Sequence, residues 1–328
     1  MPVSTQRQIR NQVLSTTKQD ATQSGTIVDD FINLTLQEIA NPGWAFPNKE
    51  RHHLWSFLRR KTTFTTVSGT SDYVMERDVD KIAILRQLNT PIRLKQIPED
   101  IFLRKVPEPN ESGNPTFYRE WSIDGVSTQL ATAGKIDLLS SSANDGSSFT
   151  ASVLGYISGR LLAETYTLNG TSAVAGTNTF DAREIFVSKS GVTAGNVTFR
   201  RNSDSSTLVV LGPEEISPRF KVITLYPSPN SAMTMYLEYY KPMRDLVNAS
   251  DVPEFHYKWH YVVRLGALAK VYQLLGKTSD FLTTQQLFAS AVRAMVANDS
   301  TNPDIIEYME PEGRGIYIDR VGLDRVIS

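Results

Sequence analysis

The sequence contains no cysteine among its 328 residues. This absence excludes disulfides, thiolate nucleophiles, iron–sulfur clusters and cysteine-based zinc sites. Histidine is scarce too: the whole chain has four, so few side chains are available for metal binding or for acid–base catalysis. The composition therefore points away from cysteine enzymes and from most metalloproteins.

An excess of charge of one sign is also missing. The chain has 34 Lys and Arg against 35 Asp and Glu, for a formal net charge of −1, which gives no electrostatic footprint for nucleic acid. No apolar run is long enough to span a bilayer, and the polar N-terminus lacks the apolar stretch of a signal peptide. We expect a protein made in a cytosol-like compartment, without a membrane partner.

Motifs that carry chemistry are absent or incomplete. There is no G-x-x-x-x-G-K-S/T phosphate loop and no G-x-S-x-G nucleophile elbow. His256 and His260 stand four apart, a spacing at which two imidazoles can share a metal, but no carboxylate ligand accompanies them. Asp78 and Asp80 fit turn hydrogen bonds better than a metal pair. We therefore predict no catalytic, cofactor-binding or metal-binding residue.

Helical periodicity is present at both ends of the chain. Residues 24–41 and 49–60 are expected to be helices, as are 253–275 and 279–298. The aromatic run FHYKWHY at the start of the third segment predicts a helix or subunit contact through His256, Trp259 and His260. The last two helices are expected to pack through their apolar residues, namely Val262, Val263, Leu265, Ala269, Leu274, Leu282, Leu287, Ala291 and Val292.

The middle of the chain has β-strand patterns. The stretch TTFTTV, a Ser-Gly-Thr-Ser turn and DYVM predict a hairpin from residue 62 to 75. Residues 141–217 are rich in Ser, Thr, Gly, Asn and Val and give short strands at even spacing, which is typical of a β-sandwich. The flanking composition is different, so this region is expected to be an inserted domain.

The expected fold class is α+β. An α-helical bundle with a β-sheet and hairpin would form a parent domain from residues 24–140 and 218–299, and residues 141–217 would be an inserted immunoglobulin-like β-sandwich. Residues 1–23 would be an N-terminal arm. Residues 300–328 would be an extended C-terminal tail, since Pro and Gly recur along it.

The tail is also apolar, which favours a binding role. Ile316, Tyr317, Ile318 and Val321 form a strand-prone piece that could add to an exposed sheet edge or fill grooves on a partner. The alternative is that the tail packs back on its own domain.

Two stretches of the sequence carry a family resemblance. The first holds DDFINLTLQEIAN, the loop around Trp44, TTFTTVSGTSDYVM and DVDKIAILRQL; the second is EYYKPMRDLVNASDVPEFHYKWHYVVRLGALAKVYQLLGK. Together they cover about half of the chain, and their order resembles the head-to-tail adaptor (connector) proteins of tailed bacteriophages. Met75 and Glu76 stand where that family often has Leu-Pro.

The resemblance implies a structural virion protein without enzymatic activity, assembled in the host cytoplasm. Such a protein forms a ring, commonly of twelve subunits, that joins the portal protein to a tail nozzle or tail tube protein. Genomic DNA passes through the ring without sequence-specific binding. Ile316, Tyr317, Ile318 and Val321 would then be portal contacts, and His256, Trp259 and His260 would lie on a ring-contact helix.

Two other functions remain open at this point. The β-sandwich could be the working part of a virion decoration or receptor-binding protein. A virion hydrolase would instead need two Asp or Glu side chains facing each other across a cleft.

Overall fold

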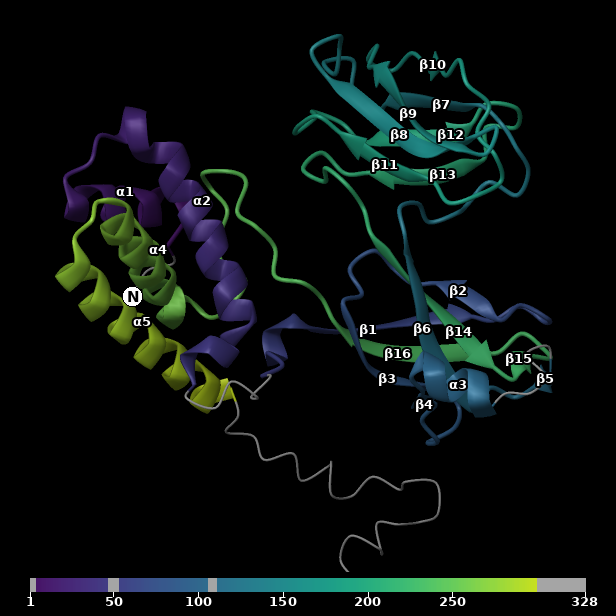
Figure 1. Cartoon of the computed structure of the whole chain (residues 1–328), viewed down its shortest axis with the longest axis horizontal. Helices are drawn as coiled ribbons and strands as arrows, with labels where there is room; N and C mark the ends of the chain where they lie inside the picture. The colour runs from purple at the N-terminus through teal and green to yellow at the C-terminus, as the bar shows by residue number, and fades with distance from the viewer. Residues whose placement is uncertain (1–3, 47–52, 106–110, 300–328) are drawn as a thin grey trace, which may run out of the picture. The chain divides into compact units, whose positions relative to one another are not determined.

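The computed structural model describes residues 4–46, 53–105 and 111–299 (Figure 1). They form two compact units. Unit 1 takes the described residues up to Arg60 and from Tyr240 onward, and unit 2 is Lys61–Tyr239. Unit 2 is thus inserted into unit 1, whose two halves come from opposite ends of the sequence.

Unit 1 is built from four helices and three short 3-10 turns. The helices are α1 (Gln6–Thr17), α2 (Ala21–Ala40), α4 (His260–Leu274) and α5 (Thr278–Asp299), and the turns are η1 (Pro42–Ala45), η2 (Ser56–Leu58) and η3 (Tyr257–Trp259). A capping box starts α1: the Thr5 side chain accepts from the Gln8 backbone, and the Gln8 side chain accepts from the Thr5 backbone. The region expected to be an N-terminal arm therefore contains a helix that packs on α2 and α4.

The core of unit 1 forms around α4, which packs against α1, α2 and α5 (Figure 1). Gly266 allows this close approach, because a Cβ there would lie 2.3 Å from Thr35 on α2 and 2.9 Å from Phe288 on α5. Phe288 is fully buried and stacks on Trp44, with ring centroids 5.0 Å apart. The N-terminal and C-terminal segments of the chain therefore share one apolar core.

The prediction of a helix over residues 49–60 is wrong for residues 53–60, which are the part of this range that the structure describes. Residues 53–55 are not helical, η2 is one 3-10 turn, and β1 begins at Arg59. Trp55 explains this path, since its indole is buried and donates from Nε1 to the Ile39 carbonyl at 2.8 Å. An extended segment places Trp55 and Leu58 in the core together.

Unit 2 contains several small sheets and the short helix α3 (Glu99–Lys105). Three of the sheets have the strand orders β1-β16-β3, β2-β14-β6-β4 and β15-β5. Their bounds are β1 Arg59–Thr65, β2 Asp72–Val74, β3 Lys81–Gln87, β4 Lys95–Gln96, β5 Ser112–Gly113, β6 Phe117–Asp124, β14 Phe220–Tyr226, β15 Ser228–Pro229 and β16 Thr234–Tyr240. The hairpin predicted between residues 62 and 75 is wrong, because β1 pairs with β16 and β2 with β14.

Two further sheets of unit 2 form a β-sandwich. One has the order β10-β7-β12-β13, the other β11-β8-β9, and both contribute to a single apolar core. The strands are β7 Ile136–Ser140, β8 Thr150–Ile157, β9 Arg160–Thr167, β10 Val174–Ala175, β11 Phe186–Lys189, β12 Val197–Arg201 and β13 Thr207–Leu211. The sandwich thus begins before residue 141, since β7 is one of its central strands and Val126 lies in its core.

One buried carboxylate in the sandwich is satisfied locally. Asp145 is fully buried and accepts from Ser140 Oγ at 2.5 Å and from the backbone of Ala194 and Gly195 at 2.6 and 2.9 Å. Burial alone raises the pKa of Asp145, but these hydrogen bonds outweigh it and hold the pKa below its ordinary value. Asp145 therefore ties a loop to the sheet as a structural carboxylate.

The predicted fold class of an α-helical bundle with a β-sheet parent domain and an inserted immunoglobulin-like sandwich is wrong. Strands in several small sheets dominate the described residues, and five helices account for 29% of the structure. A mixed α+β class is loosely compatible with this composition. The units also divide at Arg60 and Tyr240, so the small sheets belong with the sandwich and not with the helices.

Packing between α4 and α5 differs from expectation at three leucines. Val262, Val263 and the buried residues of α5 form the contact, but Leu274, Leu282 and Leu287 are exposed. The helical period explains this, because Phe288 and Val292 define the buried face of α5 and Leu287 points away from it.

The first prediction compares neighbouring residues of α5. Phe288→Ala should lower the free energy of unfolding by about 3–5 kcal/mol, since it opens a cavity beside Trp44. Leu287 is 55% exposed, so Leu287→Ala should change the free energy of unfolding by no more than about 0.5 kcal/mol. Denaturant titration of both variants measures this difference, and equal costs would contradict the assigned helix face.

Candidate functional site: an aromatic pocket at the end of α5

A pocket of about 220 Å³ opens in unit 1 beside the C-terminal end of α5. Its lining comes from three places in the sequence: the segment around η2, the segment around η3, and the last turns of α5. Two residues predicted for the ring-contact helix, His256 and Trp259, are among the lining residues. The pocket therefore brings part of the predicted contact site to one place.

Aromatic side chains form the wall of the pocket. Phe57 lies between Trp55 and Phe255, with ring centroids 5.4 and 5.7 Å away. Met295 on α5 contributes a flexible thioether to the same lining. Trp55, Phe255 and Met295 are buried, so an apolar side chain that enters the pocket would contact mainly the half-buried ring of Phe57.

Asp299 connects the end of α5 to the opposite wall. Its carboxylate lies 2.8 Å from His53 Nε2 and accepts from the Ser56 backbone at 3.0 Å and from Ser56 Oγ at 2.5 Å. A carboxylate in the last turn of a helix opposes the helix dipole, so these donors are needed to hold it there. The bonds from His53 and Ser56 to Asp299 hold the last turn of α5 against the segment around η2.

The rim of the pocket is polar and exposed. Lys258 Nζ donates to Asn298 Oδ1 at 3.0 Å and lies 5.3 Å from the centroid of the Trp259 ring. His256 is exposed, and its Nδ1 accepts from the Lys258 backbone at 3.3 Å. An apolar floor with a cationic rim suits a partner segment that combines apolar side chains with acidic ones.

His260 has a different environment from the other two predicted contact residues. It is 2% exposed; its Nδ1 accepts from the Ser4 backbone at 3.0 Å, and its Nε2 lies 3.2 Å from the Phe255 carbonyl. Burial lowers the pKa of His260 below its ordinary value, although the hydrogen bond to the Phe255 carbonyl opposes the shift. His260 is thus buried within unit 1, where it joins Ser4 to the segment that holds Phe255.

The predicted portal-contact residues Ile316, Tyr317, Ile318 and Val321 lie outside the described residues. Within residues 4–46, 53–105 and 111–299, no group of three or more His, Asp or Glu is placed to hold a metal ion. In the same part of the chain, no helix is long and apolar enough to cross a membrane.

Sequence reasoning missed six residues of the pocket, namely Trp55, Ser56, Phe57, Met295, Asn298 and Asp299. One available signal was Asp299 itself, because an acid at a helix C-terminus is unfavourable unless a tertiary partner holds it. Asp299 and Ser56 are 243 residues apart in the sequence, and a single sequence does not indicate that they are in contact.

Comparison with known proteins gives no further assignment. No protein-family model matches the chain, and a search of curated proteins finds no match.

The second prediction concerns the pH dependence set by His260. Because its folded pKa lies below that of the unfolded chain, about 6.5, the unfolded state takes up the proton first as pH falls. The stabilisation is therefore complete above about pH 6.5 and decreases as pH falls toward the folded pKa. His260→Asn should flatten this part of the pH profile in denaturant titrations between pH 7.5 and 5.

His256→Ala is the matched control, since His256 is exposed on the same segment. It should keep the loss of stability below about pH 6.5, because burial is the first cause of the His260 pKa shift and the charge of His256 adds less to it. If His260→Asn and wild type lost stability in parallel over this range, the buried neutral state of His260 would be refuted.

Proposed function

We propose that the protein is a structural subunit of a head-to-tail adaptor ring in a tailed bacteriophage. Twelve copies would join the portal protein to a tail nozzle or tail tube protein, and DNA would pass through the ring without sequence-specific binding. The role is structural, and no catalytic residue is assigned.

One observation supports this proposal most directly. The two stretches that resemble adaptor proteins lie at opposite ends of the chain, yet their helices, α2 and α4, pack on each other in one core through Thr35 and Gly266. The helical parts of the two stretches thus come together in one packed unit, whereas residues 62–88 of the first stretch belong to unit 2. Unit 2 lies between α2 and α4 in the sequence as an insertion.

The aromatic pocket gives this proposal a contact site. Asp299 fixes the pocket at the point where residues 300–328 begin, and its rim residues His256, Lys258 and Trp259 are accessible or partly so. A neighbouring subunit could place an apolar anchor there, while Ile316, Tyr317, Ile318 and Val321 would serve as the portal contact.

The third prediction tests the portal contact. The variant replaces all four predicted portal contacts by Ser, namely Ile316, Tyr317, Ile318 and Val321. It should keep the described fold. Its attachment to portal-bearing heads should fall by at least about tenfold, because apolar anchors dominate such interfaces. Attachment is measured by sedimenting heads and quantifying the bound chain, with circular dichroism as the check on folding.

Asp324→Asn with Arg325→Gln is the matched control, because it alters the same tail without removing apolar anchors. It should attach like wild type. Full attachment of the four-residue variant would remove these residues from the portal contact, and no attachment by wild type would count against the adaptor function itself.

A further inference from the structure

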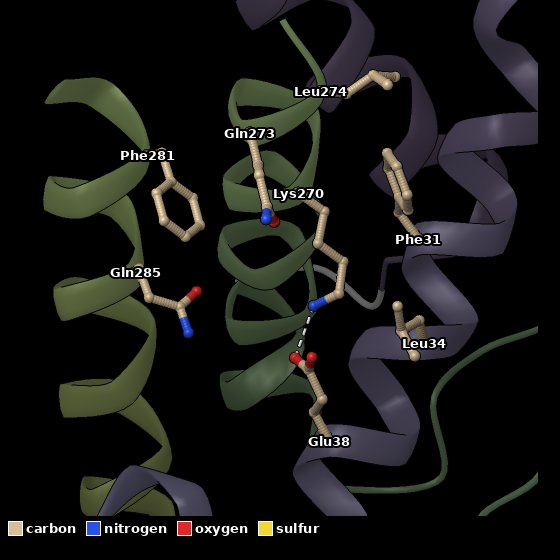
Figure 2. A pocket seen from close by; sticks show the side chains of 8 residues that line it. All are labelled: Phe31, Leu34, Glu38, Lys270, Gln273, Leu274, Phe281 and Gln285. Carbon is tan, nitrogen blue, oxygen red and sulfur yellow. Dashed lines mark hydrogen bonds and ion pairs between the residues drawn. The ribbon is translucent and has the colours of Figure 1, made fainter. Parts of the chain in front are cut away.

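A second cavity in unit 1, of about 410 Å³, lies on the surface formed by α2, α4 and α5. Figure 2 shows Phe31 and Leu34 on α2, Leu274 on α4 and Phe281 on α5 around it. Lys270 and Glu38 form an ion pair across this groove, with Nζ and Oε2 2.6 Å apart. We call this cavity the α2–α5 groove.

The groove exposes large apolar side chains. Leu34 is 50% and Leu274 is 61% exposed, so neither residue is covered by the core of unit 1. On α5, Arg293, Gln286 and Leu282 are exposed and follow one another at helical spacing. This stripe runs along α5 to Leu282, which is next in sequence to Phe281 of the groove.

Residues 300–328 follow α5 directly and contain two apolar clusters. The first is Ile305, Ile306, Tyr308 and Met309; the second begins at Ile316. Between them stands the sequence EPEGRG, whose Pro and two Gly residues break regular structure. The clusters can therefore bind in different places, and the portal proposal uses only the second one.

The length of chain matches the distance to the groove. Gln285 lies fourteen residues before Asp299 on α5, which is about 21 Å along a helix. Ile305 and Ile306 stand six and seven residues after Asp299, which is about 20–23 Å of extended chain. A nearly extended segment running back along α5 would thus bring Ile305 and Ile306 to the Gln285 edge of the groove, and Tyr308 further in toward Phe281.

Charge favours the same arrangement. Residues 304–310 carry three acids, Asp304, Glu307 and Glu310, and no base. The facing helix has no acid between Asp280 and Asp299, and Arg293 lies exposed on the stripe. Lys277 is exposed just before α5, at the end of the helix nearest the groove.

We propose that residues 304–310 bind back into the α2–α5 groove of their own chain, with Ile305, Ile306 and Tyr308 as apolar anchors. This contact holds the first part of the tail on unit 1 and presents the second cluster, from Ile316 onward, at a fixed distance from the helices. The proposal goes beyond the adaptor function and needs no portal for its test.

The fourth prediction uses the absence of native cysteine. Gln285→Cys with Ile306→Cys in the full chain should form an intramolecular disulfide in oxidised glutathione at least about ten times faster than Leu287→Cys with Ile306→Cys. Gln285 and Leu287 stand two residues apart on α5 and thus at nearly the same distance from Asp299, but of the two only Gln285 lines the groove. Peptide mapping by mass spectrometry measures the two rates.

Adding Ile305→Asp and Tyr308→Asp to the first pair should slow its reaction to the control rate, because the anchors are lost. Equal rates for the two original pairs would overturn the proposal. A disulfide found only between two chains, at a rate that rises with protein concentration, would overturn it too and assign the groove to a second copy.

Discussion

The close approach of α4 to α2 and α5 at Gly266 is the constraint on which unit 1 depends. A side chain at this position would meet Thr35 and Phe288, so the helices could not keep their spacing. That spacing stacks Phe288 on Trp44 and places Met295 and Asp299 against the segment that holds Trp55. Both the aromatic pocket and the α2–α5 groove are formed at the edges of this packing.

Long periodic segments could be predicted from the sequence, and pairings between distant strands could not. Helices α2, α4 and α5 and the β-rich character of residues 141–217 follow from local patterns of apolar residues and turns. The hairpin from 62 to 75 fails because both strands find longer partners, β16 and β14, more than 140 residues away. The segment before β1 fails as a helix because burial of Trp55 outweighs local propensity.

The candidate site was predictable only in part. His256 and Trp259 line the pocket, while His260, in the same aromatic run, turns inward to Ser4 and Phe255. A single sequence does not show which face of FHYKWHY meets the core, because that depends on residues near the N-terminus. Leu287 and Leu274 were misplaced for a related reason: apolar character identifies a helix but does not distinguish its core from a surface that binds something else.

The proposed adaptor function is tested most directly by the position and copy number of the protein in a phage particle. Cryo-electron microscopy of the particle should show twelve copies in a ring between the portal and the tail, with unit 1 and residues 300–328 nearest the portal. Copies on the capsid surface or at fibre tips, contacting their surroundings through the β-sandwich, would contradict the adaptor function and favour a decoration or receptor-binding protein.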